Sequence, residues 1–518
     1  MTLLTLIGIL MIGGFLAWLS ARWNTSLTRW ISLMACGINL IWTLFIWFGQ
    51  HSVPAISAHG QWILEYRQPW IERFGIQFYL ALDGLSLLML MLTFFLGFIS
   101  VLVSWHQIRR HAGFYYFNLL WILAGITGVF LALDLFLFYF FWEIMLIPMY
   151  FLIGIWGYEK RLYAAYKFFL FTQASGLLMF LSILSLYFIH GAQTGVYTFD
   201  LTELMETSLS SSLSLFLMAG FLIAFLVKLP AVPFHNWLPD AHTEAPTAGS
   251  VILAGLLLKT GAYGLLRFVL PLFPEAVLEF APWGMFLGAI SILYGAKLAF
   301  SQTDLKRLVA YTSVSHMGFV LLGVFALNQV AVQGVVIQMI AHGISTGALF
   351  ILVGSLQERV HTREISAFGG LWTKVPVMGS IALIFAMASL GLPGMGNFIA
   401  EFLILAGTFQ SSVFFSVMAA VGLIAATLYS LRIFQQVFQG SPSLRMETLS
   451  DLNLREMFIL GIMVILIFWL GLYPRPALDT SQKTIHGLLQ RSEISAIPGE
   501  DPPDHAEAGV GIKIQEGE

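Results

Sequence analysis

The feature that most constrains this chain is a series of apolar segments that recur along almost its whole length. A helix needs about 20 apolar residues to cross the hydrocarbon core of a bilayer, and we count about fourteen such segments. Because lipid offers no water to satisfy the backbone, each segment must be helical. With 58% hydrophobic and 10% charged residues among 518, the chain is predicted to be an all-α polytopic membrane protein.

Basic residues are distributed unevenly among the segments that connect these helices. With the N-terminus placed outside, the inner loops hold pairs such as Arg109 with Arg110 and Lys306 with Arg307, whereas residues 191–212 carry acidic side chains and no Lys or Arg. Short cytoplasmic loops collect Lys and Arg. Both termini are therefore predicted to face outside, which an even number of helices requires. The first apolar stretch lacks a preceding basic residue and is interpreted as a retained helix.

Two of the apolar segments are interrupted by proline in the same manner. Leu229-Pro230 breaks one, and Leu392-Pro393, within GLPGMGNF, breaks another. Paired breaks in corresponding halves are typical of transport sites in inverted-repeat transporters. The alternative is two independent kinks, whose freed carbonyls neighbouring helices satisfy.

These patterns divide the chain into five parts. They are N-terminal helices and an outer loop (1–78), a first repeat half (79–270), a second repeat half (271–440), a final transmembrane helix (441–490) and a disordered acidic tail (491–518).

Composition and motifs exclude several function classes. The net charge of −3 indicates no nucleic-acid partner, and the single cysteine, Cys36, excludes disulfides and cysteine-held iron–sulfur clusters within the chain. No phosphate-binding or dinucleotide-binding glycine motif is present. Any redox chemistry is therefore expected in other chains.

Four ionisable residues stand inside apolar segments, where each costs roughly 2.5–3.5 kcal/mol at the bilayer centre. They are Glu143, Lys228, Lys259 and Glu401. Glu143 and Lys228 are predicted to act as a proton switch, since an approaching carboxylate holds the lysine proton and a retreating one releases it. The alternative is a static ion pair that joins two helices. Lys259 could receive a proton from Lys228, or it could reach an interface.

Two histidines lie in consecutive later segments among hydroxyl and amide residues. His316 and His342 are interpreted as a hydrated relay, although a lone buried histidine is more often a hydrogen-bonded core residue. Glu401, beside the second break, is interpreted as an exit or gate group, or as a partner for the amides that the break frees. Lys297 lies near an inner loop and is expected to reach the interface.

Other polar residues are interpreted as structural. Asp83 and Asp134 stand where helices are expected to begin, so both are predicted N-caps. His235, Asp240 and His242 could suggest a metal site, but the stretch is flanked by prolines and lacks a thiolate, so metal binding is disfavoured.

Three stretches resemble the core motifs of the antiporter-like membrane subunits of respiratory complex I. They are VKLPAVPFHNWLPDAHTEAPTAGSVILAGLLLKTGAYGLLRF (227–268), SQTDLKRLVAYTSVSHMGF (301–319) and GLPGMGNFIAEF (391–402). The resemblance covers nearly everything from residue 80 to residue 476. It implies fourteen helices, with two inverted five-helix repeats whose broken helices meet a central hydrophilic axis. Within the family, Glu401 stands where the L and N subunits have lysine, and no room remains for the long C-terminal helix of the L subunit.

The resemblance also implies residue roles and partners. By position it assigns a tuning glutamate, a pumping lysine, a connecting lysine, two intervening histidines and a terminal carboxylate, which are Glu143, Lys228, Lys259, His316, His342 and Glu401. The chain would hold no cofactor. FMN, iron–sulfur clusters, NADH and quinone would be bound by partner subunits, and the L and N subunits would be neighbours in a bacterial plasma membrane.

The leading hypothesis is thus a proton-translocating subunit of NADH:quinone oxidoreductase, driven by quinone reduction elsewhere, so that the isolated chain would catalyse nothing. The alternative is a subunit of a multi-subunit Mrp-type sodium/proton antiporter, which resembles the same fold. A third reading is a scaffold between pump subunits whose buried charges are inert.

Overall fold

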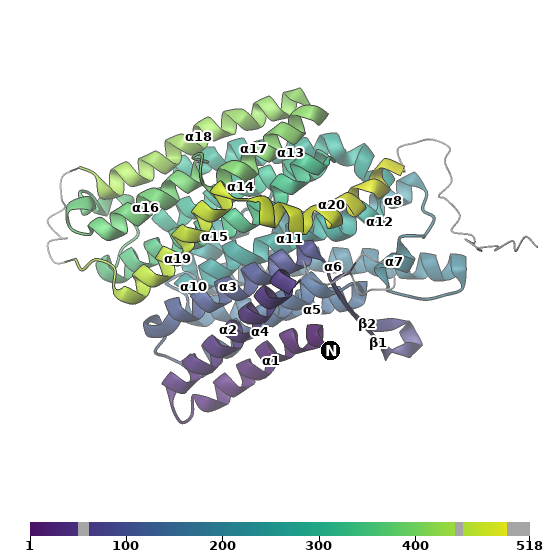
Figure 1. Cartoon of the computed structure of the whole chain (residues 1–518), viewed down its shortest axis with the longest axis horizontal. Helices are drawn as coiled ribbons and strands as arrows, with labels where there is room; N and C mark the ends of the chain where they lie inside the picture. The colour runs from purple at the N-terminus through teal and green to yellow at the C-terminus, as the bar shows by residue number, and fades with distance from the viewer. Residues whose placement is uncertain (50–61, 441–448, 495–518) are drawn as a thin grey trace, which may run out of the picture.

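The computed structural model describes residues 1–49, 62–440 and 449–494. Within these ranges, thirteen helices are long and apolar enough to cross a membrane. A shorter apolar helix, α16, is followed after a break by α17, and the two together supply one further, interrupted span. The prediction of about fourteen spans with two broken helices is therefore confirmed. Figure 1 shows the spans as a bundle of tilted, roughly parallel and antiparallel helices.

The uninterrupted spans are α1 (Thr2–Ser20), α2 (Thr25–Gly49), α3 (Gly84–Gln107), α4 (Ala112–Leu131), α5 (Leu135–Trp156), α6 (Arg161–Thr194), α8 (Ser211–Lys228), α13 (Pro274–Phe300), α14 (Leu305–Phe325), α15 (Gln329–Val360), α18 (Val413–Phe438) and α19 (Leu454–Leu472). One further span runs through α10 (Thr247–Ile252), η2 (Leu253–Leu257), α11 (Leu258–Gly264), η3 (Leu265–Val269) and α12 (Leu270–Leu272). The shorter helices are α7 (Leu201–Leu204), α9 (Trp237–Glu244), α16 (Pro376–Ser389), α17 (Gly396–Ser411) and α20 (Arg475–Ile494).

The two chain breaks lie where the proline pairs predict them. Helix α8 ends at Lys228, directly before Leu229-Pro230, and the chain resumes helical structure in α9. Helix α16 ends at Ser389, and α17 begins after a turn in which Gly391 and Gly394 have φ of 77° and 96°. These angles lie in the left-handed region that glycine adopts without strain.

Several predicted helix starts are confirmed. The Asp83 carboxylate accepts a hydrogen bond from the Ser86 amide (2.9 Å), and Asp134 accepts one from the Leu137 amide (2.9 Å). Each carboxylate satisfies an amide that the first helical turn leaves without a partner.

Close helix contacts depend on glycine. A β-carbon at Gly288 on α13 would lie 2.7 Å from the Leu322 amide nitrogen, and one at Gly318 on α14 would lie 2.7 Å from the Ile292 amide nitrogen. Small residues at membrane helix contacts let the backbones approach and gain dispersion energy. The pair α13 and α14 therefore forms a close crossing beside the polar interior.

One antiparallel hairpin was not predicted. Strands β1 (Leu64–Ile71) and β2 (Ile76–Leu82) pair around a turn in which Gly75 has a φ of 67°. The all-α prediction is thus correct for the membrane-spanning bundle but missed this sheet. The predicted boundary at residue 79 also falls inside β2.

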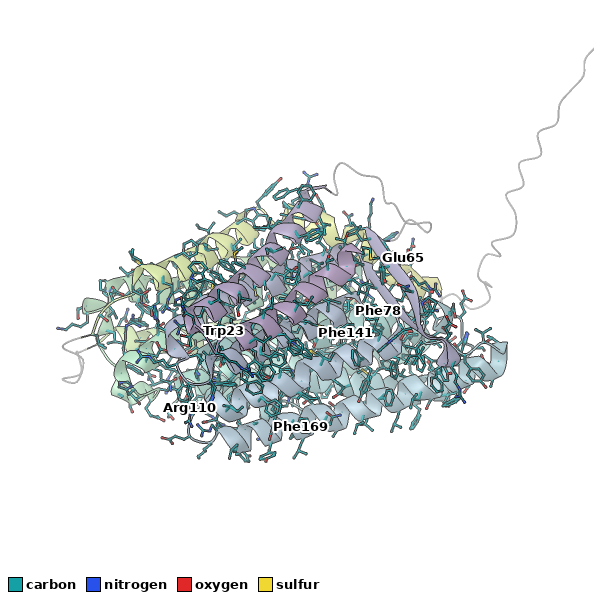
Figure 2. All side chains as sticks on the ribbon, turned by 90° about the horizontal axis from the view of Figure 1, so that it is seen from below. Trp23, Glu65, Phe78, Arg110, Phe141 and Phe169 are labelled. Atoms are coloured by element: carbon teal, nitrogen blue, oxygen red, sulfur yellow. The ribbon has the colours of Figure 1, made fainter. Side chains whose placement is uncertain are left out.

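The two ends of the bundle are distinguished by their loops. Figure 2 places Trp23 and Arg110 at one end and Glu65 at the other. We call the end that carries β1, β2 and α7 the hairpin end, and the end that carries Arg110 the basic end (Figure 1). Helix α20, which was not predicted as a separate element, crosses the bundle over α3, α12, α13 and α15. It extends past the predicted boundary at residue 491, and the rest of the predicted tail lies outside the described residues.

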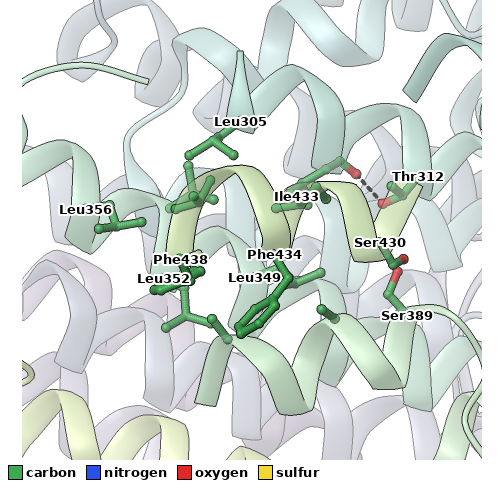
Figure 3. A pocket seen from close by; sticks show the side chains of 15 residues that line it. Leu305, Thr312, Leu349, Leu352, Leu356, Ser389, Ser430, Ile433, Phe434 and Phe438 are labelled. Atoms are coloured by element: carbon green, nitrogen blue, oxygen red, sulfur yellow. Dashed lines mark hydrogen bonds between the residues drawn. The ribbon is translucent and has the colours of Figure 1, made fainter. Parts of the chain in front are cut away.

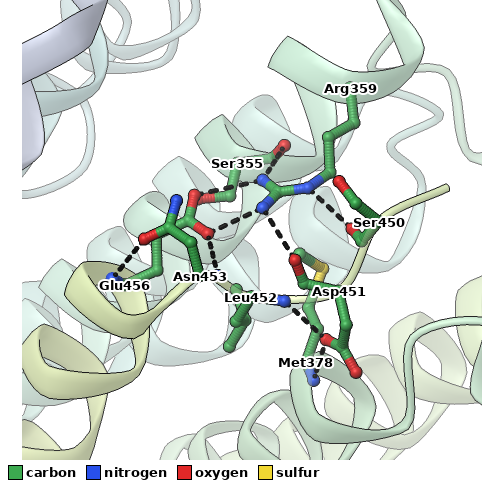
Figure 4. Close-up of polar contacts among 8 residues, drawn as sticks. All are labelled: Ser355, Arg359, Met378, Ser450, Asp451, Leu452, Asn453 and Glu456. Atoms are coloured by element: carbon green, nitrogen blue, oxygen red, sulfur yellow. Dashed lines mark hydrogen bonds and ion pairs between the residues drawn. The ribbon is translucent and has the colours of Figure 1, made fainter.

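At the basic end, one ion pair joins α15 to α19. Arg359 donates to both carboxylate oxygens of Glu456, at 3.1 and 2.6 Å, and to the Asp451 carbonyl at 3.2 Å (Figure 4). The Asp451 carboxylate accepts from the Val377 and Met378 amides at the start of α16. This network fastens three helix ends together.

Candidate proton path

A continuous row of four buried ionisable side chains crosses the centre of the bundle. The Lys259 ammonium lies 2.6 Å from His342 Nδ1. The imidazole rings of His342 and His316 have centroids 5.5 Å apart, and His316 Nδ1 lies 3.1 Å from Glu401 Oε1. All four residues are at most 2% exposed. The row brings together four of the six residues that the sequence predicted as a relay.

The elements that position this row come from both predicted halves. Lys259 lies on α11, between the two π-helical turns η2 and η3, and its ammonium donates to the Ala254 carbonyl five residues earlier at 2.6 Å. π-turns within α-helices are frequent at functional sites. His316 projects from α14, His342 from α15 and Glu401 from α17, just after the second break.

Hydroxyl and amide side chains complete the row at the Glu401 end. His316 Nε2 lies 3.1 Å from Ser389 Oγ, and Gln338 Nε2 donates to Glu401 Oε1 at 3.5 Å. The sequence predicted hydroxyl and amide residues beside the two histidines, but it did not identify Ser389 as one of them. Ser389 is the last residue of α16, so only the folding back of the broken helix brings it to His316.

Two cavities adjoin this end of the row. A cavity of about 300 Å³ borders Glu401 and is lined mainly by Phe398, Phe402, Leu405 and Leu423 on α17 and α18. A smaller cavity of about 40 Å³ runs among α14, α15, α16 and α18, and Figure 3 shows its apolar walls with Thr312, Ser389 and Ser430 gathered on one side. A water needs roughly 10–15 Å³ and at least two polar partners. The larger cavity, bordered by Glu401 and Thr427, can therefore hold water beside the row, whereas the walls of the smaller one are almost wholly apolar.

Glu143 and Lys228 lie on neighbouring helices but do not pair directly. The Lys228 ammonium, which is 1% exposed, has no hydrogen-bond partner among the described residues and lies 4.8 Å from the centroid of the Trp142 ring. The Glu143 carboxyl, which is only partly buried, contacts Tyr139 on α5 and Gln173 on α6. The predicted switch pair is thus separated in this structure, and the Lys228 cation faces an aromatic ring instead.

The expected contact between Lys228 and Lys259 is not present as a hydrogen bond in the described part of the chain. The two helices that carry them are nevertheless close, since a β-carbon at Gly261 would lie 2.9 Å from the Leu229 amide nitrogen. The first break therefore places Lys228 beside the helix of Lys259, and no side chain among the described residues bonds to both ammonium groups.

Two further ionisable residues toward the basic end are buried, although the sequence analysis assigned neither of them to the relay. Lys306 is fully buried, donates to the Ala245 carbonyl at 2.8 Å and lies 4.8 Å from the Tyr158 ring centroid. The sequence pattern places it in a basic loop, because it closely follows the helix-capping Asp304. His242 is fully buried and stacks on Phe350 with ring centroids 4.5 Å apart.

The stretch that contains His235, Asp240 and His242 holds a contact between one carboxylate and two cations. Asp240 accepts from Lys167 (2.7 Å) and Arg307 (2.8 Å), so its carboxylate is already engaged by two cations. No cluster of three or more potential metal ligands occurs within residues 1–49, 62–440 and 449–494. Lys297 is exposed, which agrees with a side chain that reaches the surface of the bundle.

Comparisons with known proteins identify the family. Residues 132–427 match the family described as NADH:quinone oxidoreductase/Mrp antiporter, TM. The chain is 55% identical over 488 residues to NADH-quinone oxidoreductase subunit M of Pseudomonas aeruginosa, and 52% identical over 487 residues to that of Escherichia coli K12. Both alignments cover 92% of this chain and 96% of the relative. The chain belongs to the M-subunit family of NADH-quinone oxidoreductase.

Solved structures agree with this assignment. Respiratory complex I from Thermus thermophilus contains a chain that matches with a TM-score of 0.83 and 30% identity, covering 94% of this chain and all of that one. The Mrp complex from Dietzia sp. matches with a TM-score of 0.80 but 19% identity, which shows a shared fold alone. The chain is therefore a multi-pass membrane subunit of the antiporter type in complex I, and the predicted resemblance is confirmed.

Proposed function

We propose that this M-type subunit moves protons through Glu143, Lys228, Lys259, His316, His342 and Glu401. The observation that supports the proposal most strongly is the unbroken row from Lys259 to Glu401. Lys259 lies within hydrogen-bond distance of His342, and His316 lies within hydrogen-bond distance of Glu401. The two imidazole rings contact each other edge to face. Buried ionisable residues that face the interior of a membrane bundle are typical of proton relays.

In this proposal, Lys259 passes a proton to His342, and His316 passes it on to Glu401. Imidazole suits the intermediate positions because one ring nitrogen can accept a proton while the other donates one. The cavity beside Glu401 supports an exit there, since water in it could take the proton from the carboxyl. The two predicted halves, residues 79–270 and 271–440, would thus supply the lysine side and the carboxyl side of one path.

The separation of Lys228 from Glu143 supports a gating role for the first half. In this structure the carboxyl is engaged by Tyr139 and Gln173, and the Lys228 ammonium faces Trp142. A movement of Glu143 toward Lys228 would stabilise the ammonium, and a retreat would favour release of its proton toward Lys259. Water is required between Lys228 and Lys259 for that step, because no side chain in the described ranges bridges them.

We further propose the arrangement of the complex around this chain. NADH, FMN, iron–sulfur clusters and quinone are bound by other subunits, and quinone reduction there drives the relay. The L-type and N-type antiporter-like subunits are the neighbours within the membrane. The hairpin end faces the outside of a bacterial plasma membrane, because the opposite end carries Arg109 and Arg110.

The test replaces Lys228 with methionine and Glu143 with glutamine in the whole complex. Both changes keep an unbranched side chain of similar size while removing the charge, and the exposed Lys297→Met serves as the matched control. We expect closed membrane vesicles with either core variant to acidify poorly during NADH oxidation, although the complex assembles. Normal acidification would favour the scaffold reading, and acidification that requires sodium would favour the antiporter reading.

A further inference from the structure

A second buried polar network lies on the helix that carries Lys259, nearer the hairpin end. Arg267 forms an ion pair with Asp83, and its Nε donates to the Tyr263 hydroxyl at 3.1 Å. That hydroxyl also donates to the Phe130 carbonyl at 2.9 Å and lies 3.0 Å from Ser86 Oγ. Asp83, Ser86, Tyr263 and Arg267 are each at most 3% exposed. None of them belongs to the proposed relay.

The network stands between Lys259 and the hairpin end. Lys259, Tyr263 and Arg267 follow one another at intervals of four residues, so they lie on one side of the helix. The Lys259 ammonium nevertheless turns away from Tyr263, toward the Ala254 carbonyl and His342. Arg267 is eight residues further along, which is about 12 Å of helix rise.

The hydrogen bonds of the Tyr263 hydroxyl leave it unable to relay a proton. A hydroxyl donates one hydrogen bond and accepts two. This one donates to a peptide carbonyl, which does not release protons, and it is approached by the Arg267 and Ser86 donors. No free acceptor position therefore faces Lys259.

The same network is covered on its far side. The Trp62 ring lies 5.4 Å from the Arg267 guanidinium carbon. A β-carbon at Gly84, next to Asp83, would overlap the Thr480 carbonyl oxygen of α20. Helix α20 thus lies directly on the start of α3, and the ion pair is closed off from both directions.

We propose that Arg267, Asp83 and Tyr263 form a seal that stops protons on Lys259 from leaving directly toward the hairpin end. This inference rests on the proposed role of Lys259 and adds the direction in which protons leave that residue. The paired guanidinium neither takes up nor gives up a proton, so it forms an electrostatic barrier along the helix, and the hydroxyl offers the proton no acceptor. Protons on Lys259 are thereby sent sideways to His342. A fixed arginine serves as this kind of electrostatic barrier in other membrane pores.

The seal predicts that substitutions of the two partners of the ion pair have different effects on proton leak. Arg267→Gln leaves an uncompensated carboxylate that attracts protons, whereas Asp83→Asn leaves an uncompensated guanidinium that repels them. A unit charge about 12 Å away at an effective dielectric constant of about 20 changes proton occupancy about tenfold. We therefore expect roughly tenfold greater passive proton leak through the reconstituted complex with Arg267→Gln, and no added leak with Asp83→Asn. A purely structural ion pair predicts equal effects.

Two controls complete the experiment. Arg359→Gln breaks the comparable ion pair at the basic end and should not cause a leak. In the double variant Arg267→Gln, Lys259→Met, the leak should disappear, because the path starts at Lys259. A leak that persists there would overturn the seal while leaving the relay open to its own test. Equal leak in the Arg267 and Asp83 variants would overturn it as well.

A third measurement does not depend on assembly of the charge variants. Ser86→Cys changes one atom and places a thiol inside the network, while the natural Cys36 is fully buried and provides the background. A small membrane-impermeant thiol reagent added at the hairpin end should leave complexes that carry Ser86→Cys unlabelled during turnover. Rapid labelling would show water at position 86 and would refute the seal.

Discussion

The strongest single prediction concerns His342, which joins the lysine to the carboxyl side of the row. His342→Phe keeps a planar ring of similar size but removes both nitrogens. The ring is fully buried on α15, so the substitution leaves the surface of the bundle unchanged. We expect the complex to assemble and to pump protons very slowly.

The expected size of the effect follows from the geometry. Proton transfer requires donor and acceptor within about 3 Å or one bridging water. His342 lies between the two groups that it connects. Its Nδ1 is 2.6 Å from the Lys259 ammonium, and its ring centroid is 5.5 Å from that of His316. Loss of a positioned proton-transfer group typically costs about 10²–10⁴ in rate. Pumping should therefore fall at least about 100-fold, or about 2.7 kcal/mol in barrier.

The assay uses closed, inverted membrane vesicles supplied with NADH and a pH-sensitive dye. An immunoblot of native gels of the same membranes counts the assembled complexes. His190→Phe is the matched control. His190 is also buried, but it lies near the hairpin end of α6, away from the row, and its ring bonds to the Thr207 hydroxyl. Normal acidification per complex with His342→Phe would refute the relay as drawn.

Three further outcomes are expected. Arg359→Ala should leave the Glu456 carboxylate without its bidentate partner and lower the stability of the solubilised complex by about 3 kcal/mol, which thermal unfolding can measure. Burial raises the pKa of Asp134 from its ordinary 3.8 to about 6, so its contribution to stability is full below about pH 4 and is lost as the pH rises through 6. Corrected hydrogen exchange in β2 should accordingly be slower at pH 5 than at pH 8, and Asp134→Asn should remove the difference. Gly318→Leu should prevent assembly by driving a side chain into α13, whereas Gly461→Leu, where nothing lies within 4 Å, should assemble normally on a blot of native membranes.

The parts of the fold that could be predicted are those that the bilayer itself dictates. Spans and breaks follow from segment length and from proline, because a lipid-exposed backbone has no other way to satisfy its hydrogen bonds. The same reasoning identified Lys259 and Glu401, since a charge within an apolar segment must face the interior. The sequence predicted the two histidines between these residues, but no local pattern contains the distance between Lys259 and His342, which lie 83 residues apart.

What could not be predicted depends on partners distant in the sequence. Arg267 lies five residues before the end of its apolar span, where a lysine or arginine often reaches an interface, and its partner Asp83 lies 184 residues earlier. The separation of Glu143 from Lys228 also depends on rotamers that a sequence does not record. The hairpin was missed because Pro69 lies within β1, and proline usually argues against a strand.

Helix α20 has a mechanical consequence. It touches α3 and α12 from the first half and α13 and α15 from the second, and Trp47 Nε1 donates to its Thr480 hydroxyl at 2.8 Å. Because α20 packs against helices of both halves, the two halves have little freedom to move apart. Alternating access in this subunit would then come from rotating side chains and shifting water files, while the scaffold around them stays still.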